Sequence, residues 1–181
     1  MKPCRGCDRH RPLLPEKPLL PPTDCNTTDI FTVIYSPKVP PNLGTTHKID
    51  TLLTNCSDFR LVDDAVMFMN KHYKSNYDQL VLPGASAGVV NYPDWRRSYF
   101  EQIDLLFSLH HQHEVHLMDH EDCGVYKALY GPQFYKEHMF QLHALNLRKC
   151  KELLQERLSD VPKLLVKMLL MMLDGTVLSL A

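Results

Sequence analysis

The chain has almost no net charge and no long uninterrupted apolar segment. Its 181 residues include 20 Lys and Arg against 21 Asp and Glu, which gives a formal net charge of -1. Such a balanced chain has no broad attraction for phosphate backbones or anionic lipid, so nucleic-acid binding is disfavoured. The longest apolar run, residues 164–173, contains Lys167, and it is far shorter than the roughly 20 residues that a membrane-spanning helix needs. We therefore expect no membrane span.

The N-terminal region also lacks the apolar core of a secretory signal. Lys2 and Arg5 supply positive charge there, but the apolar pairs that follow are interrupted by Pro15 and Pro18. Charge alone leaves an organellar leader open, although the prolines oppose the amphipathic helix that such leaders form. The 6 cysteines are too sparse for a disulfide-stapled domain. We expect a cytoplasmic protein with reduced thiols.

Proline is concentrated at one end of the chain. Most of the 13 prolines lie in the first 41 residues, which excludes regular helix and central strand there. We predict a Pro-rich extended arm over residues 1–47 and one folded domain over residues 48–181. Within the arm, residues 30–35 are β-branched and aromatic enough to form a short edge strand or a segment that lies across the surface.

From residue 48 onward, short apolar runs alternate with longer helical patterns, which is typical of βαβ units. The predicted fold class is therefore α/β, with a mostly parallel central sheet flanked by helices. Small residues at 84–88 predict a loop that faces a site. The predicted strands are 49–54, 79–82, 115–118 and, at a sheet edge, 176–180. The predicted helices are 61–73, 97–110, 132–157 and a last one from 160 toward 173.

Two motifs follow the ends of the first and third predicted strands: Cys-Ser-Asp-Phe-Arg at 56–60 and His-Glu-Asp-Cys-Gly at 120–124. Ligands bind at this edge of open α/β sheets. Residues two apart on an extended segment point the same way, so Cys56, Asp58 and Arg60 can present a thiolate, a carboxylate and a guanidinium together.

The second motif contributes an imidazole and another thiol. His120 ends a predicted strand, and Cys123 would start the next helix, whose N-terminus lowers the pKa of a thiol. Gly124 would allow close packing there. Cys56, His120 and Cys123 together have the ligand composition of a catalytic zinc site with one open position. Water in that position would supply a hydroxide nucleophile, whereas Asp58 in that position would close the site.

These motifs resemble the zinc site of the β-carbonic anhydrases, which is built from C-x-D-x-R and, some tens of residues later, H-x-x-C-G. The resemblance covers roughly residues 48–180 in the order of elements. It implies reversible hydration of carbon dioxide to bicarbonate by zinc-bound hydroxide. It further implies that Asp58 accepts a hydrogen bond from the hydroxide while Arg60 holds Asp58. A homodimer, often assembled further, is also implied.

The sequence departs from this family at two points. Pro83-Gly84 stands where an Arg-Asn pair is common, and Glu121 adds a negative charge where a small polar residue is frequent. Two alternative functions therefore stay open. One is a related zinc enzyme that hydrolyses carbon disulfide or carbonyl sulfide. The other is a non-catalytic zinc-stabilised interaction protein, in which Asp58 closes the metal site and the arm binds a partner.

Three further features are more simply explained by structure than by chemistry. Cys4 and Cys7 have the gap of a zinc knuckle, but prolines crowd them and incidental thiols are the favoured interpretation. Met168 and its neighbours Met171 and Met172 predict core or dimer contact. A group of four histidines could relay protons, but we expect these side chains to lie in a solvated helix end and loop, far from His120 along the strand. They are His110, His111, His113 and His116.

Overall fold

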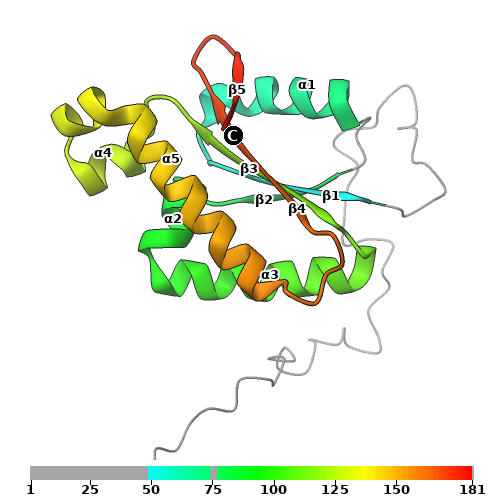
Figure 1. Cartoon of the computed structure of the whole chain (residues 1–181). Coiled ribbons are helices and arrows are strands. Elements are labelled where there is room, and N and C mark those ends of the chain that lie inside the picture. Colours follow the sequence, from blue (N-terminus) through cyan, green and yellow to red (C-terminus); the bar gives the residue numbers. More distant parts are fainter. Residues whose placement is uncertain (1–48, 74–76, 181) are drawn as a thin grey trace, which may run out of the picture. The chain divides into compact units, whose positions relative to one another are not determined.

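The computed structural model describes residues 49–73 and 77–180, all within one compact unit, Thr46–Ala181. In this unit a 5-stranded sheet has the order β2-β1-β3-β4-β5 (Figure 1). Its first four strands along the chain are parallel, and the last is antiparallel to β4 and lies at the sheet edge. The strands are β1 (Thr51–Asn55), β2 (Tyr77–Val81), β3 (Glu114–His120), β4 (Leu165–Met171) and β5 (Val177–Leu180). The predicted α/β class is confirmed.

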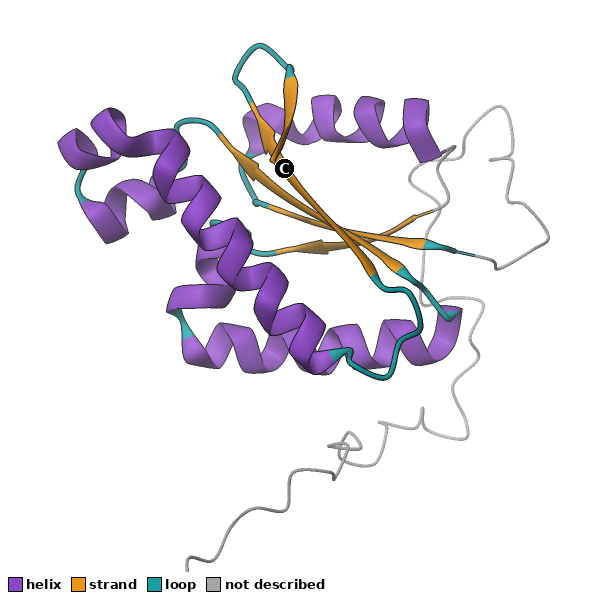
Figure 2. Ribbon diagram, viewed as in Figure 1, coloured by secondary structure: helices purple, strands orange, loops and turns teal. Residues whose placement is uncertain are grey.

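Helices cover both faces of the sheet (Figure 2). On one face lies α1 (Val62–Tyr73), which the short 3-10 turn η2 (Phe59–Leu61) precedes. The other face carries α2 (Ser86–Asn91), α3 (Pro93–His110) and the long α5 (Pro132–Arg157), which is kinked at His138. A further helix, α4 (Gly124–Tyr130), follows β3. Among the described residues, no helix has the length and apolar character needed to cross a membrane.

The two faces of the sheet bury separate apolar cores because neighbouring strand residues point to opposite sides. Leu52 and Leu117 belong to the core that includes residues of α3 and α5. Leu53 and Met118 belong to the core that includes residues of α1. A parallel strand that is buried on both faces reads as a continuous apolar run, and this is why β1 is recognisable in the sequence.

Burial on both faces of the sheet also explains why the prediction of a last helix is wrong. The sequence predicts a helix from residue 160 toward 173, but the structure places β4 at Leu165–Met171. Leu and Met favour helices intrinsically, yet this run is inserted between β3 and β5 and is buried on both sides, so pairing in the sheet outweighs propensity. Lys163, with a φ of 58°, ends the preceding turn in a left-handed conformation that no helix could continue through. Met168 and Met171 are buried in the two cores, as predicted for core residues.

Some predictions lie on residues outside the described ranges. These are the edge strand at 30–35, the Cys4 and Cys7 pair, and the boundary between arm and domain at residue 47, which stays a prediction. Inside the described ranges, the expected loop at 84–88 is a turn that runs directly into α2.

Gly88 in α2 packs too closely for any side chain. A Cβ added to Gly88 would lie 2.5 Å from the carbonyl oxygen of Pro83. We expect Gly88→Ala to lower the free energy of unfolding by about 1–3 kcal/mol in urea denaturation, because backbone must move. The matched control is Gly124→Ala, since no atom of the described chain lies within 4 Å of a Cβ there. An equal loss in both variants would contradict the packing argument.

Candidate metal centre

Cys56, His120 and Cys123 come together at the carboxyl edge of the sheet. Cys56 directly follows β1, His120 ends β3, and Cys123 is the N-terminal cap of α4. Because β1 and β3 are parallel neighbours, their carboxyl ends meet at one edge. One ligand atom from each of the three residues lies within 4.8 Å of the other two. No other group of three His, Cys, Asp or Glu side chains is this close within residues 49–73 and 77–180.

His120 presents its Nε2 atom to this group. Its Nδ1 atom lies 2.7 Å from the carbonyl oxygen of Glu121, so Nδ1 donates the hydrogen bond, and in the neutral imidazole, the form that binds a metal, Nε2 carries no proton. Nε2 is buried and has no hydrogen-bond partner in the described part of the chain. A buried polar atom without a partner is costly, and a metal ion would satisfy it. The residues present therefore fit a metal of the kind that two thiolates and one imidazole bind.

The electrostatics of the site favour a thiolate at Cys56. A hydrogen bond from the Cys123 thiol, together with His120 and the Gly84 amide, outweighs burial and lowers the pKa of Cys56 to about 4. The Gly84 N–H donates to Cys56 Sγ at 3.2 Å. The pKa of Cys123 is raised because its thiol donates to Cys56 and is itself buried. Burial disfavours the charged form of His120, but the Cys56 thiolate beside it produces a net rise in the pKa of His120.

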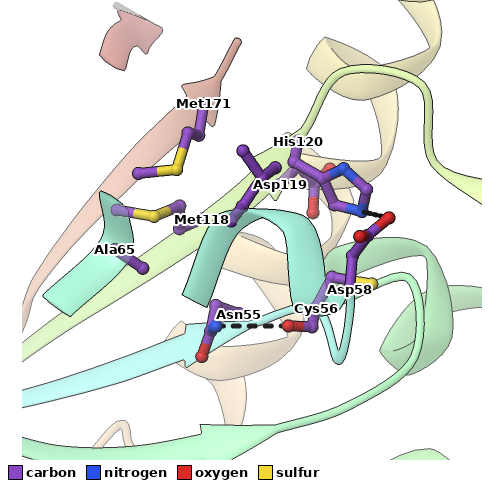
Figure 3. Close-up of a pocket in the computed structure, with 9 residues that line it drawn as sticks. Asn55, Cys56, Asp58, Ala65, Met118, Asp119, His120 and Met171 are labelled. Atoms are coloured by element: carbon purple, nitrogen blue, oxygen red, sulfur yellow. Dashed lines mark hydrogen bonds and ion pairs between the residues drawn. The ribbon is translucent and has the colours of Figure 1, made fainter. Parts of the chain in front are cut away.

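Asp58 lies beside this group and is held by Arg60. The Arg60 Nε and Nη2 atoms donate to the two carboxylate oxygens of Asp58 at 2.9 and 2.7 Å. These hydrogen bonds are the main reason that the pKa of Asp58 falls to about 2. Figure 3 shows the carboxylate directed at the imidazole, with Oδ2 3.8 Å from His120 Nε2. The pairing arises at the turn into η2, where Asp58 also caps the Arg60 amide, rather than along an extended segment as predicted.

Arg60 has a second carboxylate partner that the sequence analysis missed. Its Nη1 atom donates to Asp122 Oδ2 at 3.0 Å, and Lys127 also donates to Asp122. Asp122 lies within the second motif, so this contact joins the two motifs through Arg60. The sequence did contain a signal for this contact, because Asp122 is acidic and lies within the second motif.

The two departures from the family pattern have local structural explanations. The Glu121 carboxylate accepts the backbone N–H of Leu173 at 3.0 Å, which ties it to the turn after β4. At the Pro83-Gly84 position, the Gly84 amide contacts the Cys56 sulfur. The expectation that Gly124 allows close packing is wrong within the described chain, because a Cβ built there would meet nothing within 4 Å.

A small cavity adjoins the site on the α1 side. Its wall is apolar where Leu61, Ala65, Met118 and Met171 meet, and polar where Asp58 and His120 contribute (Figure 3). It has room for little more than one water-sized molecule. The candidate metal centre therefore borders a narrow space whose wall is apolar on one side and polar on the other.

The histidine group lies at the opposite end of the sheet from His120, as expected. His110 ends α3 and pairs with Asp78 at 2.6 Å. The expectation of a solvated group is wrong for His116, which lies inside β3, is fully buried and contacts Glu114 at 2.7 Å.

Fold and site together define an α/β protein with a possible metal centre of two cysteines and one histidine. Two solved structures share this fold. The β-carbonic anhydrase CafA of Aspergillus fumigatus matches with a TM-score of 0.53 and 17% identity, over 77% of this chain and 79% of that one. The carbonic anhydrase of Streptococcus mutans matches with a TM-score of 0.50 and 15% identity, over 75% and 84%. At this identity the likeness shows the fold.

No family model matches the chain. Two curated relatives do. The uncharacterized protein RC0076 of Rickettsia conorii is 36% identical over 141 residues, which cover 75% of this chain and 74% of the relative. An uncharacterized protein of Rickettsia bellii is 33% identical over 141 residues, covering 75% and 84%. This protein belongs to the same family as these two rickettsial proteins, whose names state no activity.

Proposed function

We propose that this protein is a zinc-dependent carbonic anhydrase of the β class, which reversibly hydrates carbon dioxide to bicarbonate. The observation that carries the proposal is the convergence of Cys56, His120 and Cys123 within 4.8 Å, with Asp58 beside them. The fold shared with solved carbonic anhydrases supports it.

In this proposal Cys56, His120 and Cys123 hold the metal. A bound zinc ion supplies Lewis acidity and makes a nucleophile available from water near neutral pH. Asp58, whose Oδ2 lies 3.8 Å from His120 Nε2, would accept a hydrogen bond from that water. Arg60 keeps Asp58 ionised and fixed by two hydrogen bonds. The apolar side of the adjoining cavity, where Leu61, Met118 and Met171 meet, would favour an uncharged substrate over a charged one.

The contacts of Asp58 bear on the non-catalytic alternative. Closing the metal site with Asp58 would bring the metal into competition with Arg60 for this carboxylate, which Arg60 contacts at 2.9 and 2.7 Å. Arg60 is itself held by Asp122, so the open arrangement is favoured. An apolar wall beside the site does not distinguish carbon dioxide from carbon disulfide or carbonyl sulfide, which are therefore the alternative substrates. We also propose a homodimer, since Phe59, next to Asp58, is 86% exposed and offers apolar surface to a second copy.

Stopped-flow hydration of carbon dioxide tests the function. The zinc-loaded protein is followed with a pH indicator from neutral to alkaline pH, beside Cys56→Ser. We expect the protein to accelerate hydration and Cys56→Ser to lose both zinc and hydration, because a ligand is removed. One zinc per chain without hydration at any pH would contradict the proposal and direct the assay to carbon disulfide and carbonyl sulfide.

A further inference from the structure

Asp119, which precedes His120, is an acidic residue in the protein interior. Its side chain is fully buried at the end of β3. The carboxylate accepts hydrogen bonds from the backbone N–H of Ser86 at 3.0 Å, the Ser86 hydroxyl at 2.6 Å and the Tyr126 hydroxyl at 2.5 Å. His143 Nδ1 lies 3.0 Å from the same carboxylate. Burial of a carboxylate is tolerated only when its lone pairs are satisfied in this way.

One route of hydrogen bonds runs from this carboxylate to Cys123. With Nδ1 of His143 donating to Asp119, Nε2 is left to accept, and the Tyr135 hydroxyl lies 3.1 Å from it. The Tyr135 oxygen in turn accepts the backbone N–H of Cys123 at 3.4 Å. Each donor in this series of hydrogen bonds points toward Asp119, so the bonds polarise one another in the same direction.

A second route runs from the carboxylate to Cys56. Ser86 is bound to Asp119 through both its amide and its hydroxyl. The two residues before it, Gly84 and Ala85, have φ values of 73° and 41°. The left-handed conformation is costly for Ala85 and persists only where surrounding contacts enforce it. The bonds to Ser86 hold this turn in place, and the turn presents the Gly84 amide to Cys56 Sγ.

We propose that Asp119 is the positioning residue of the metal centre, with a separate connection to each of the three candidate ligands. It reaches Cys56 through Ser86 and the turn, Cys123 through His143 and Tyr135, and His120 through the peptide bond. The inference rests on the proposed function only in that Cys56, His120 and Cys123 bind a metal. In this role Asp119 holds the three ligands at their binding distances before the metal binds.

Zinc affinity, measured by competition with a chromophoric chelator, tests the proposal. Asp119→Asn places an amide NH2 group among hydroxyl and N–H donors, and we expect it to weaken zinc binding about 10- to 100-fold. Because this variant also disturbs a buried network, a pair of milder substitutions accompanies it. Tyr135→Phe removes only the hydroxyl on the route to Cys123, and we expect a zinc affinity about 10-fold lower.

Tyr99→Phe is the matched control. It also removes one buried hydroxyl, but that hydroxyl contacts Thr54 Oγ1 at 2.8 Å and makes no contact with Asp119 or with its partners. We expect Tyr99→Phe to keep zinc affinity within about threefold, even where it lowers the unfolding free energy as Tyr135→Phe does.

The absorption spectrum of the cobalt(II)-substituted protein supplies a second readout. A distorted ligand set changes the cobalt bands in Tyr135→Phe and Asp119→Asn but not in Tyr99→Phe. Unchanged zinc affinity in Tyr135→Phe, or equal losses in both tyrosine variants, would overturn the proposal. Because the readout is metal binding, a chain that binds zinc without hydrating carbon dioxide contradicts the proposed function and not this inference.

Discussion

Replacing Cys123 by Ala is expected to lower bound zinc from about one ion per chain to less than about a tenth of that, because a site left with two ligands binds far more weakly. Metal analysis of the purified protein after dialysis measures this directly. Cys123 is buried at the start of α4, and an alanine side chain offers no ligand atom in its place.

Cys150→Ala is the control for the loss of a buried thiol. Cys150 lies in α5, is fully buried, and has a pKa raised by that burial, so it is a packed apolar residue rather than a ligand. We expect Cys150→Ala to retain the zinc of the parent protein. Full zinc in Cys123→Ala would contradict the ligand assignment, as would loss of zinc in both variants.

Replacing Asp58 by Asn is expected to slow hydration by about 10²- to 10⁴-fold while zinc remains bound. The amide keeps the size of the side chain but accepts only through one oxygen, and Arg60 loses the charge that holds it. Stopped-flow rates on metal-loaded protein, normalised to bound zinc, measure the effect.

Asp63→Asn is the matched control for a lost carboxylate, because Asp63 is an exposed residue in the first turn of α1. We expect its hydration rate to equal that of the parent protein. A parental rate in Asp58→Asn would contradict the proposed role of Asp58, and loss of zinc in that variant would show that the carboxylate contributes to metal binding.

The sequence pattern identified those strands and helices whose burial produces a regular spacing of apolar residues. β1 and β3 are short apolar runs followed by polar motifs, and their position at the sheet centre follows from that composition. β4 has a similar composition but is rich in Leu and Met, so propensity favoured a helix. Only pairing with β3 and β5, which is non-local, decides its conformation.

The candidate site also has features that the sequence predicts and features that it does not. The meeting of Cys56, His120 and Cys123 was predictable because parallel strands end at one edge, whereas their role as ligands stays a prediction. The contacts of Asp119 were not predictable. Its partners Ser86 and His143 lie in α2 and α5, and nothing in their local sequence indicates that they converge on one carboxylate.

The positions of the candidate ligands along the chain have a consequence for unfolding. Cys56 lies after β1 and Cys123 before α4, and α1, β2, α2, α3 and β3 all lie between them. A metal bound to both would act as a cross-link that closes this long loop and so reduces the conformational entropy of the unfolded chain. Chelation would then do what reduction does to a disulfide-bonded protein: it would free a large part of the sheet to separate.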